Sequence, residues 1–220
     1  MSEPPPLDPT DRTRLKRLPE RGSFDREVID AILDEGVICH LGFVHEAQPF
    51  VVPTIHGREG DTVYLHGSVA SRMLRTLGSG AAACLTVTLL DGLVVARSGF
   101  HSSMNYRSVM LLGSPRVVED PDEKLRALDV IIDHVIPGRA KELRAHTAVE
   151  LRQTVVLALP IVEGSAKVRT GDPKDDPDDI AGDAWAGVIP LQLLAGEPVP
   201  SGDLQPDVAM PPSVEHYRRP

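Results

Sequence analysis

The chain has 220 residues with a formal net charge of −9, and 41% of its residues are hydrophobic. A chain of this length can bury about 70% of its unfolded surface, so it can be stable as one domain without disulfides or a structural metal. The acidic excess argues against nucleic-acid binding, which depends on a basic surface. The sequence has no signal peptide and no apolar run long enough to cross a membrane. It therefore favours a cytoplasmic protein that binds neither membranes nor nucleic acid.

The first half of the chain predicts an arm, a helix and an antiparallel meander. Residues 1–22 combine prolines with mixed charge, which is typical of an arm outside the core. Ser23 can cap a helix whose apolar positions recur at helical spacing until Gly36. Strands joined by short polar turns are predicted over 37–44, 49–56 and 62–66.

The hydrophobic period changes after the third of these strands. Residues 62–65 alternate as in a strand, whereas residues 70–77 carry apolar side chains at helical spacing. The glycine between them permits close approach of a ligand, and free amides at a helix start favour an anion. We therefore predict a phosphate-binding corner, although an ordinary strand-to-helix junction with solvated arginines fits the pattern equally well. The corner comprises His66, Gly67, Ser68, Ser71, Arg72 and Arg75.

The second half predicts further strands and helices. Strands are expected over 81–97, with a break at Asp91-Gly92, and over 106–118, 154–170 and 184–191, and helices over 121–136 and 147–153. Recurrent prolines from residue 196 predict an extended tail that can wrap a partner subunit. The expected boundaries are 1–22 for the arm, 23–195 for the domain and 196–220 for the tail. Six or seven hairpin-connected strands with inserted helices predict a mainly β, α+β fold that closes as an antiparallel barrel.

Few side chains form a recognisable reactive cluster. Cys39 and Cys84 lie in apolar strand-like runs, which predicts buried, reduced thiols. The histidines show no metal-binding spacing, so we expect no metal site. His66 and His101 stand out beside glycine and serine at strand ends, although structural histidines show the same pattern. Trp185, the only tryptophan, is either a stacking surface for a flat ligand or a core residue.

Two polar stretches could contact an anion. Residues 98–108 could supply amide, hydroxyl and guanidinium donors to one ligand, or form a turn rich in local hydrogen bonds. Lys167 and Arg169 lie two apart on one predicted strand and so share a face. Two cations on one face suggest an anionic partner or a neighbouring row of carboxylates.

Six motifs follow one another in a fixed order. They are Val52-Pro-Thr, Tyr64-Leu-His-Gly-Ser-x-x-Ser-Arg, Val87-Thr-Leu-Leu-Asp-Gly-Leu-Val, Phe100-His-Ser-Ser-Met-Asn-Tyr-Arg-Ser-Val, Ser165-Ala-Lys-Val-Arg-Thr-Gly and Trp185-Ala-Gly-Val-Ile-Pro-Leu. In this order they resemble the flavin-binding split-barrel proteins of the pyridoxamine 5′-phosphate oxidase-like superfamily. The resemblance is greatest to the nitroimidazole-resistance-type flavin-nucleotide-binding branch, and it covers roughly residues 24–191. It implies a dimeric antiparallel split barrel with FMN at the homodimer interface.

The resemblance also implies which residues bind the flavin. Ser71 and Arg72 match the phosphate grip of the family, and Met73 stands where the oxidases proper carry lysine. FAD and a deazaflavin are compatible with the same corner. The implied contacts are Val52, Pro53 and Thr54 at the ring edge, His66, Gly67 and Ser68 beside the ribityl chain and phosphate, Ser71, Arg72 and Met73 at the phosphate, and Asn105, Tyr106, Arg107, Ser108, Lys167 and Trp185 from later strands, Trp185 across the dimer.

Three functions are compatible with this resemblance. The leading hypothesis is a flavin-dependent oxidoreductase that reduces a nitroaromatic or quinone-like molecule with electrons from transiently bound NADH or NADPH, with His66 as candidate proton donor. The second is a haem-binding or haem-degrading split-barrel protein, with His40, His66 or His101 as axial ligand. The third is a flavin or deazaflavin binder without turnover.

Overall fold

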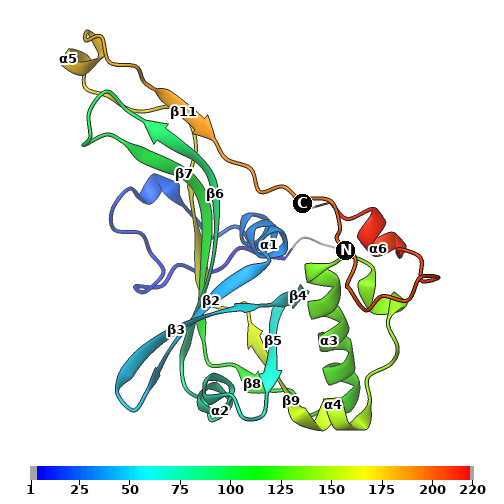
Figure 1. The fold of residues 1–220 in the computed structure, drawn as a ribbon. Coiled ribbons are helices and arrows are strands. Elements are labelled where there is room, and N and C mark those ends of the chain that lie inside the picture. The colour runs from blue at the N-terminus through cyan, green and yellow to red at the C-terminus, as the bar shows by residue number, and fades with distance from the viewer. Residues whose placement is uncertain (1–3, 219–220) are drawn as a thin grey trace. The chain divides into compact units, whose positions relative to one another are not determined.

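A computed structural model describes residues 4–218 of the chain (Figure 1). The chain divides into two compact units, which we describe one by one. Unit 1 consists of Met1–Gly36, Thr86–Leu111 and Glu163–Leu193, and unit 2 consists of Val37–Leu85, Leu112–Val162 and Leu194–Pro220. Each unit therefore collects segments that are far apart in the sequence.

Antiparallel sheets form most of the regular structure. The strands are β1 (Gly22–Ser23), β2 (Ile38–His45), β3 (Gln48–Ile55), β4 (Gly57–Glu59), β5 (Thr62–Ser68), β6 (Ala83–Val95), β7 (Ser103–Gly113), β8 (Arg116–Val117), β9 (Thr154–Pro160), β10 (Gly164–Arg169) and β11 (Gly187–Pro190). The seven-stranded sheet has the order β1-β10-β7-β6-β2-β3, with β11 also paired to β6. A four-stranded sheet has the order β4-β5-β9-β8. The antiparallel, α+β fold is thus confirmed, whereas the second sheet was not expected.

The helices are short, except for α1 and α3. They are η1 (Pro19–Arg21), α1 (Arg26–Glu35), α2 (Arg72–Gly78), α3 (Pro121–Val135), η2 (Arg139–Glu142), α4 (Ala148–Gln153), α5 (Pro177–Ile180) and α6 (Pro212–Glu215). No helix within residues 4–218 is long and apolar enough to span a bilayer.

In unit 1, helix α1 begins two residues later than the sequence suggested. Asp25 is the N-cap, and its carboxylate accepts a hydrogen bond from the backbone N–H of Glu27 at 3.0 Å. The predicted cap at Ser23 was wrong because Ser23 is still extended in β1, where it pairs with Ala166 of β10. C-terminal to this cap, α1 buries an apolar face that consists of Ile29, Ile32 and Leu33.

In unit 2, helix α3 packs on the four-stranded sheet (Figure 1). Its buried residues Ala127, Leu128 and Ile131 form one cluster with Tyr64 of β5 and with residues of β9. Gly57 of β4 permits the close approach, because a Cβ atom there would lie 2.9 Å from the backbone of Ile131. This packing gives unit 2 a core on the side of the sheet that α3 covers.

Three strand boundaries differ from the sequence-based prediction. The segment 106–118 divides into β7 and β8 because Pro115 lacks the N–H that a continuous ladder needs. The segment 154–170 likewise divides, after Pro160, into β9 and β10, which belong to different sheets. Strand β6, by contrast, continues through Gly92, where a break was expected. A Cβ at Gly92 would lie 3.0 Å from the carbonyl oxygen of Ile189, so glycine allows β11 to pair there.

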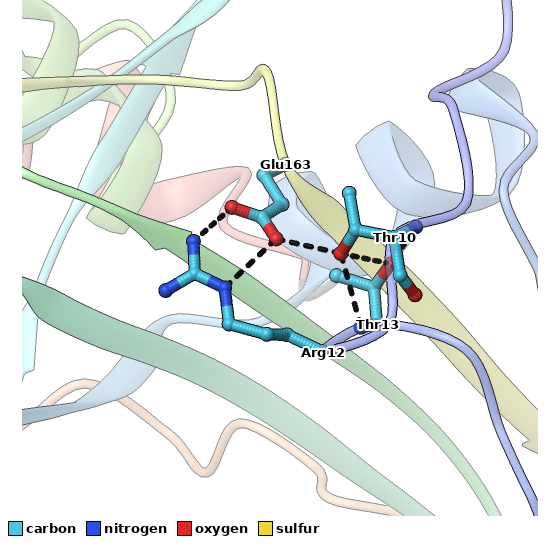
Figure 2. A network of polar contacts seen from close by, with 4 residues as sticks. All are labelled: Thr10, Arg12, Thr13 and Glu163. Atoms are coloured by element: carbon cyan, nitrogen blue, oxygen red, sulfur yellow. Dashed lines mark hydrogen bonds and ion pairs between the residues drawn. The ribbon is translucent and has the colours of Figure 1, made fainter.

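Contacts to Glu163 anchor the arm, residues 4–22, to the rest of unit 1 (Figure 2). The hydroxyl of Thr10 donates to Glu163 at 2.6 Å, and Arg12 donates to the same carboxylate through Nε at 3.1 Å and through Nη2. The backbone N–H of Leu7 also donates to the carbonyl of Phe24 at 2.8 Å. The arm therefore follows a defined path along unit 1.

We expect Glu163→Gln to make the arm more susceptible to proteolysis. Arg12, followed by Thr10, lowers the pKa of Glu163, so the ionised carboxylate is the form that the folded protein favours. The ionised Glu163 carboxylate therefore contributes to folding stability above the ordinary pKa range of a carboxylate. This contribution is lost as the pH falls through the lowered pKa. Limited trypsin digestion followed by mass spectrometry should show faster cleavage after Arg14 and Arg17. Glu20→Gln, which removes an exposed carboxylate of the arm, should cleave like the wild type. Equal rates for both variants would contradict the anchor.

The tail is mostly exposed between residues 194 and 210 and contacts unit 2 near its end. The backbone N–H of Ser213 donates to the carboxylate of Glu142 at 3.0 Å, and its hydroxyl donates to the same group. The expectation that the tail wraps a partner subunit stays a prediction.

Candidate functional site

The predicted phosphate corner lies in unit 2, where β5 leads into α2. The hydroxyl of Ser71 accepts from the N–H of Leu74 at 3.4 Å and so caps α2, and that of Ser68 accepts from the N–H of Ala70 at 3.2 Å. Gly67 has a packing role, because a Cβ there would lie 3.0 Å from a methyl group of Leu74. Both hydroxyls and the glycine therefore already serve the local fold.

Two exposed cations lie at this corner, Arg72 at the start of α2 and Arg75 in its last turn, and Arg72 is the one that an aromatic ring positions. Its guanidinium lies 5.1 Å from the centre of the Phe50 ring, so a cation–π contact positions an exposed charge. Among residues 4–218, no carboxylate forms an ion pair with Arg72. Met73, beside it, is half-buried. A positive charge held by an aromatic ring, without a counter-ion, suits an anionic ligand group.

The predicted ring-edge residues lie on β3, which ends the seven-stranded sheet. Val52, Pro53 and Thr54 pair with Leu41, His40 and Cys39 of β2. Strand β3 has a ladder partner on one side within residues 4–218, so its other side presents backbone donors and acceptors. Val52 and Thr54 are half-buried and Pro53 is exposed. This edge is compatible with the backbone contacts to a flavin ring that the resemblance implied.

The residues expected from later strands lie in unit 1. Three of them, Asn105, Arg107 and Ser108, form polar contacts with other groups of unit 1. Asn105 is buried, donates to the carbonyl of Gly171 at 3.1 Å and accepts from Arg169. The hydroxyl of Ser108 donates to the carbonyl of Lys167 at 3.3 Å. Their polar groups therefore hold β7, β10 and the turn after β10 together.

Arg107 is neutralised within unit 1. Its guanidinium donates to Asp91 at 2.8 and 3.1 Å and to Glu35 at 2.8 Å. Hydrogen bonds to these two carboxylates, Glu35 first, raise the pKa of Arg107. Of the remaining predicted residues, Tyr106 and Lys167 are half-buried, and Trp185 is 67% exposed. An arginine with two carboxylate partners is a poor anion receptor. Lys167 is therefore a better candidate than Arg107 to bind an anionic ligand group.

A cavity of about 580 Å³ lies in unit 2 on the side of β5 that faces α3. His66 lines it and lies on the same face of β5 as Tyr64, two residues earlier, which packs against α3. Arg139, His146 and Glu150 supply polar groups at the lining. The apolar lining comprises Ile55, Leu128, Ile131, Ile132, Val135, Ile136 and Leu143.

His66 is the unsatisfied polar group of this cavity. Its Nδ1 is buried and has no hydrogen-bond partner among residues 4–218. Burial lowers the pKa of His66 below the ordinary 6.5, so the ring is neutral at physiological pH. A neutral imidazole without a partner, in a largely apolar cavity, is suited to bind a metal centre or a proton donor.

The other two histidines considered as axial ligands have different surroundings. His40 is exposed on β2. His101 lies in unit 1 with its Nε2 3.2 Å from the carboxylate of Asp176. Of the three, His66 alone lines an apolar cavity. Arg139 and His146 were not predicted as site residues, because they lie in the short η2 and in the connection to α4, where the sequence shows no periodicity.

Residues 4–218 contain no group of three or more side chains placed to hold a metal ion directly. Burial raises the pKa of the Cys39 thiol to about 12 and also raises the pKa of Cys84. Both cysteines are free, and Cys39 is buried as predicted, whereas Cys84 is half-buried. High thiol pKa values make these groups weak nucleophiles and weak metal ligands.

Comparison with known proteins gives consistent matches. Residues 25–168 match the model of the pyridoxamine 5′-phosphate oxidase family. No curated protein sequence matches the chain. The flavocytochrome Anf3 from Azotobacter vinelandii is 44% identical, with a TM-score of 0.91 over 97% of this chain and 99% of that one. The FAD and haem binding protein from Mycobacterium smegmatis is 43% identical, with a TM-score of 0.86 over 89% and 96%. A candidate 5-nitroimidazole antibiotic resistance protein from Bacteroides thetaiotaomicron is 29% identical, with a TM-score of 0.56 over 66% and 84%.

Proposed function

Because the chain belongs to the pyridoxamine 5′-phosphate oxidase family, we propose that it is a redox protein that binds both a flavin and a haem. The two solved structures with the highest identity given above are named as a flavocytochrome and as an FAD and haem binding protein. The observation that carries the proposal is the cavity lined by His66, whose buried Nδ1 lacks a partner among the described residues. The two leading hypotheses from the sequence thus become two parts of one function.

The cavity residues fit a haem. A haem ligated by histidine needs a neutral imidazole and apolar walls for the macrocycle, and hydrogen-bond donors or cations favour its propionates. His66 would be the axial ligand, and the apolar side chains of α3 would contact the macrocycle. Arg139, on the same lining, already donates to Glu142 at 3.2 Å, so a propionate there would compete with that carboxylate. His146, on the same lining, is the alternative ligand.

The corner at β3 and α2 fits a flavin nucleotide. Arg72 would bind the phosphate, while the open side of β3 would face the ring through its backbone groups. We propose FAD as the nucleotide, because the relative from Mycobacterium smegmatis is named for it. FMN, which the sequence resemblance suggested first, is the alternative. Chromatography of the flavin released from the denatured protein distinguishes FMN from FAD.

The cofactors would carry the electrons, and the protein would position and insulate them. A bound flavin supplies two-electron hydride chemistry and a bound haem supplies one-electron transfer. The chain's own contribution is a neutral His66, a largely apolar cavity lining, and a positive charge at Arg72. Reduction of a nitroaromatic or quinone-like acceptor with electrons from NADH or NADPH is the activity that we propose for this arrangement.

We also propose that the flavin lies at a homodimer interface. Trp185 supports this proposal, since 67% of its surface is exposed and protein interfaces commonly bury such aromatic side chains. Analytical ultracentrifugation of the wild type and of Trp185→Ala tests it. A monomeric wild type would contradict the dimer.

The visible spectrum of the purified protein tests the main proposal. We expect one intense haem band together with the two bands of a flavin. Denaturation and chromatography should then release haem and FAD in similar amounts. A colourless protein that takes up neither cofactor would overturn the whole proposal. A protein that binds flavin but no haem would overturn the proposal that it binds haem. Anaerobic addition of NADH or NADPH should bleach the flavin bands if the nicotinamide linkage is correct.

A further inference from the structure

A cleft of about 320 Å³ in unit 1 gathers positive charge in a chain that is acidic overall. Its basic lining consists of Arg17 and Arg21 from the arm and of Arg169 and Lys174 from the end of β10 and the turn after it. His101 also lines the cleft. None of these residues belongs to the flavin or haem sites proposed above.

The positive charges of the cleft are not neutralised by the protein. Arg17, Arg21 and Lys174 form no ion pair with any carboxylate of residues 4–218. Of the acidic side chains that follow β10, Asp175 pairs with Arg97 at 2.9 Å, and Asp176 lies 3.2 Å from His101, which itself lines the cleft. Like charges that converge without a counter-ion are unfavourable, and a bound anion would relieve their repulsion.

Arg169 is the buried member of the cluster. It is 7% exposed, and its guanidinium donates to three neutral oxygens: the side-chain oxygen of Asn105 and the carbonyls of Gly171 and Asp172, the last two at 3.2 Å. These bonds fix the guanidinium without neutralising it. Burial, followed by the positive charge of Arg21, lowers the pKa of Arg169. The protein therefore holds a buried cation beside a second cation.

The backbone around the cleft is shaped to bring these cations together. Leu18 adopts a left-handed conformation with φ 55° and ψ 57°, which is unfavourable for a residue with a Cβ atom. This conformation reverses the chain between Arg17 and Arg21, so that both line the cleft. Gly171, at φ 92°, turns its carbonyl toward Arg169. Contacts of Thr10 and Arg12 with Glu163 hold the arm in place, as described above.

An aromatic face completes the cleft. Phe100 is 88% exposed, and its ring lies 5.0 Å from the ring of His101 at an angle of 86°. An exposed phenylalanine ring is costly in water and offers a stacking surface for a flat, polar ring. Cations that converge beside such a surface match the two chemical parts of a nucleotide, a phosphate group and a base.

We propose that this cleft binds a nucleotide, with its phosphate groups on Arg17, Arg21, Arg169 and Lys174 and its base stacked on Phe100. The ligand would be a free nucleotide, separate from the proposed cofactors. The inference rests on the geometry of unit 1 and holds whether or not haem binds in unit 2.

Calorimetric titration of ADP into flavin-loaded protein tests the proposal. Arg21→Gln/Lys174→Gln should weaken ADP binding by about tenfold for each cation removed, since a hydrogen bond from a charged donor contributes about that much. The control is Arg14→Gln/Lys16→Gln, which removes the same charge from exposed positions of the arm outside the cleft and should bind ADP like the wild type. Phe100→Ala should weaken binding of ADP but not of inorganic pyrophosphate.

Saturable ADP binding that depends on Arg21 and Lys174 would support the cleft as a nucleotide site. No ADP binding, or equal ADP affinities of wild type, double variant and control, would overturn the proposal. Flavin and haem content of the wild type, measured separately, reports on the function proposed above.

Discussion

Replacing His66 by alanine should abolish the haem band of the purified protein while the flavin bands remain. His66 is the candidate ligand that lines the apolar cavity, and its buried Nδ1 lacks a partner within residues 4–218. We expect haem affinity to fall by about 100-fold or more, because even residues that only orient a metal ligand are worth about 10–100-fold. Titration of haem into the cofactor-free variant, followed at the haem band, measures the change.

Two other histidines serve as controls for this result. His146→Ala alters the same cavity and should retain a haem band, with its position shifted if the ring contacts the haem. His101→Ala changes unit 1 and should leave the spectrum unchanged. Loss of haem in His146→Ala with retention in His66→Ala would assign the axial ligand to His146 and contradict our assignment.

The pH dependence of stability offers a second readout of His66. Burial lowers its pKa in the folded state, so below the ordinary value of 6.5 the unfolded chain binds more protons than the folded one. The contribution of neutral His66 to the free energy of unfolding is therefore present above pH 6.5 and is lost as the pH falls below 6.5. Thermal unfolding of haem-free protein should show this decline in the wild type, and the decline should be smaller in His66→Ala.

Replacing Arg72 by alanine should be the most damaging single change for flavin binding. Its guanidinium has an aromatic neighbour, Phe50, but no carboxylate partner within residues 4–218. A hydrogen bond from a charged donor to a phosphate contributes about 1.5–3 kcal/mol, so the dissociation constant should rise by about tenfold to somewhat more than a hundredfold. Fluorescence titration of the cofactor-free protein with FAD and with FMN measures the two dissociation constants.

Arg75→Ala is the matched control, because it removes an exposed arginine from the same short helix. We expect a change of at most about threefold, since long-range charge effects at an exposed site are screened by salt. Circular dichroism should show that both variants are folded. If Arg72→Ala binds flavin as tightly as the wild type, the phosphate assignment at this corner is wrong.

The sequence by itself was sufficient for those features that depend on residues close together in the chain. The switch from period two to helical spacing located β5 and α2 correctly, because each period reflects the geometry of one element. The apolar face of residues 121–136 likewise identified α3. The order of six motifs identified the family, and the structure and the comparisons agree with it.

The tertiary structure decided which polar residues are available to a ligand. Arg107 was expected at the flavin, yet Glu35 and Asp91 neutralise it, and they lie 72 and 16 residues away in the sequence. Pairings of this kind depend on which strands become neighbours, and no local pattern encodes that choice. The missed division of residues 106–118 between two sheets has a local cause, Pro115, but the assignment of β7 and β8 to different sheets again depends on which strands become neighbours.

Both clefts that carry our proposals are products of long-range packing. His66 was one of three equivalent histidines in the sequence, and only the packing of α3 against β5 showed that it lines an apolar cavity. The cationic cleft joins three segments of unit 1. The sequence suggested ligand donors in residues 98–108 and at Arg169, but not that Arg17 and Arg21 of the arm line the same cleft. Sequence periodicity determined the elements and the family of this protein, whereas burial and convergence of side chains, which exist only in the folded chain, decided where its ligands would bind.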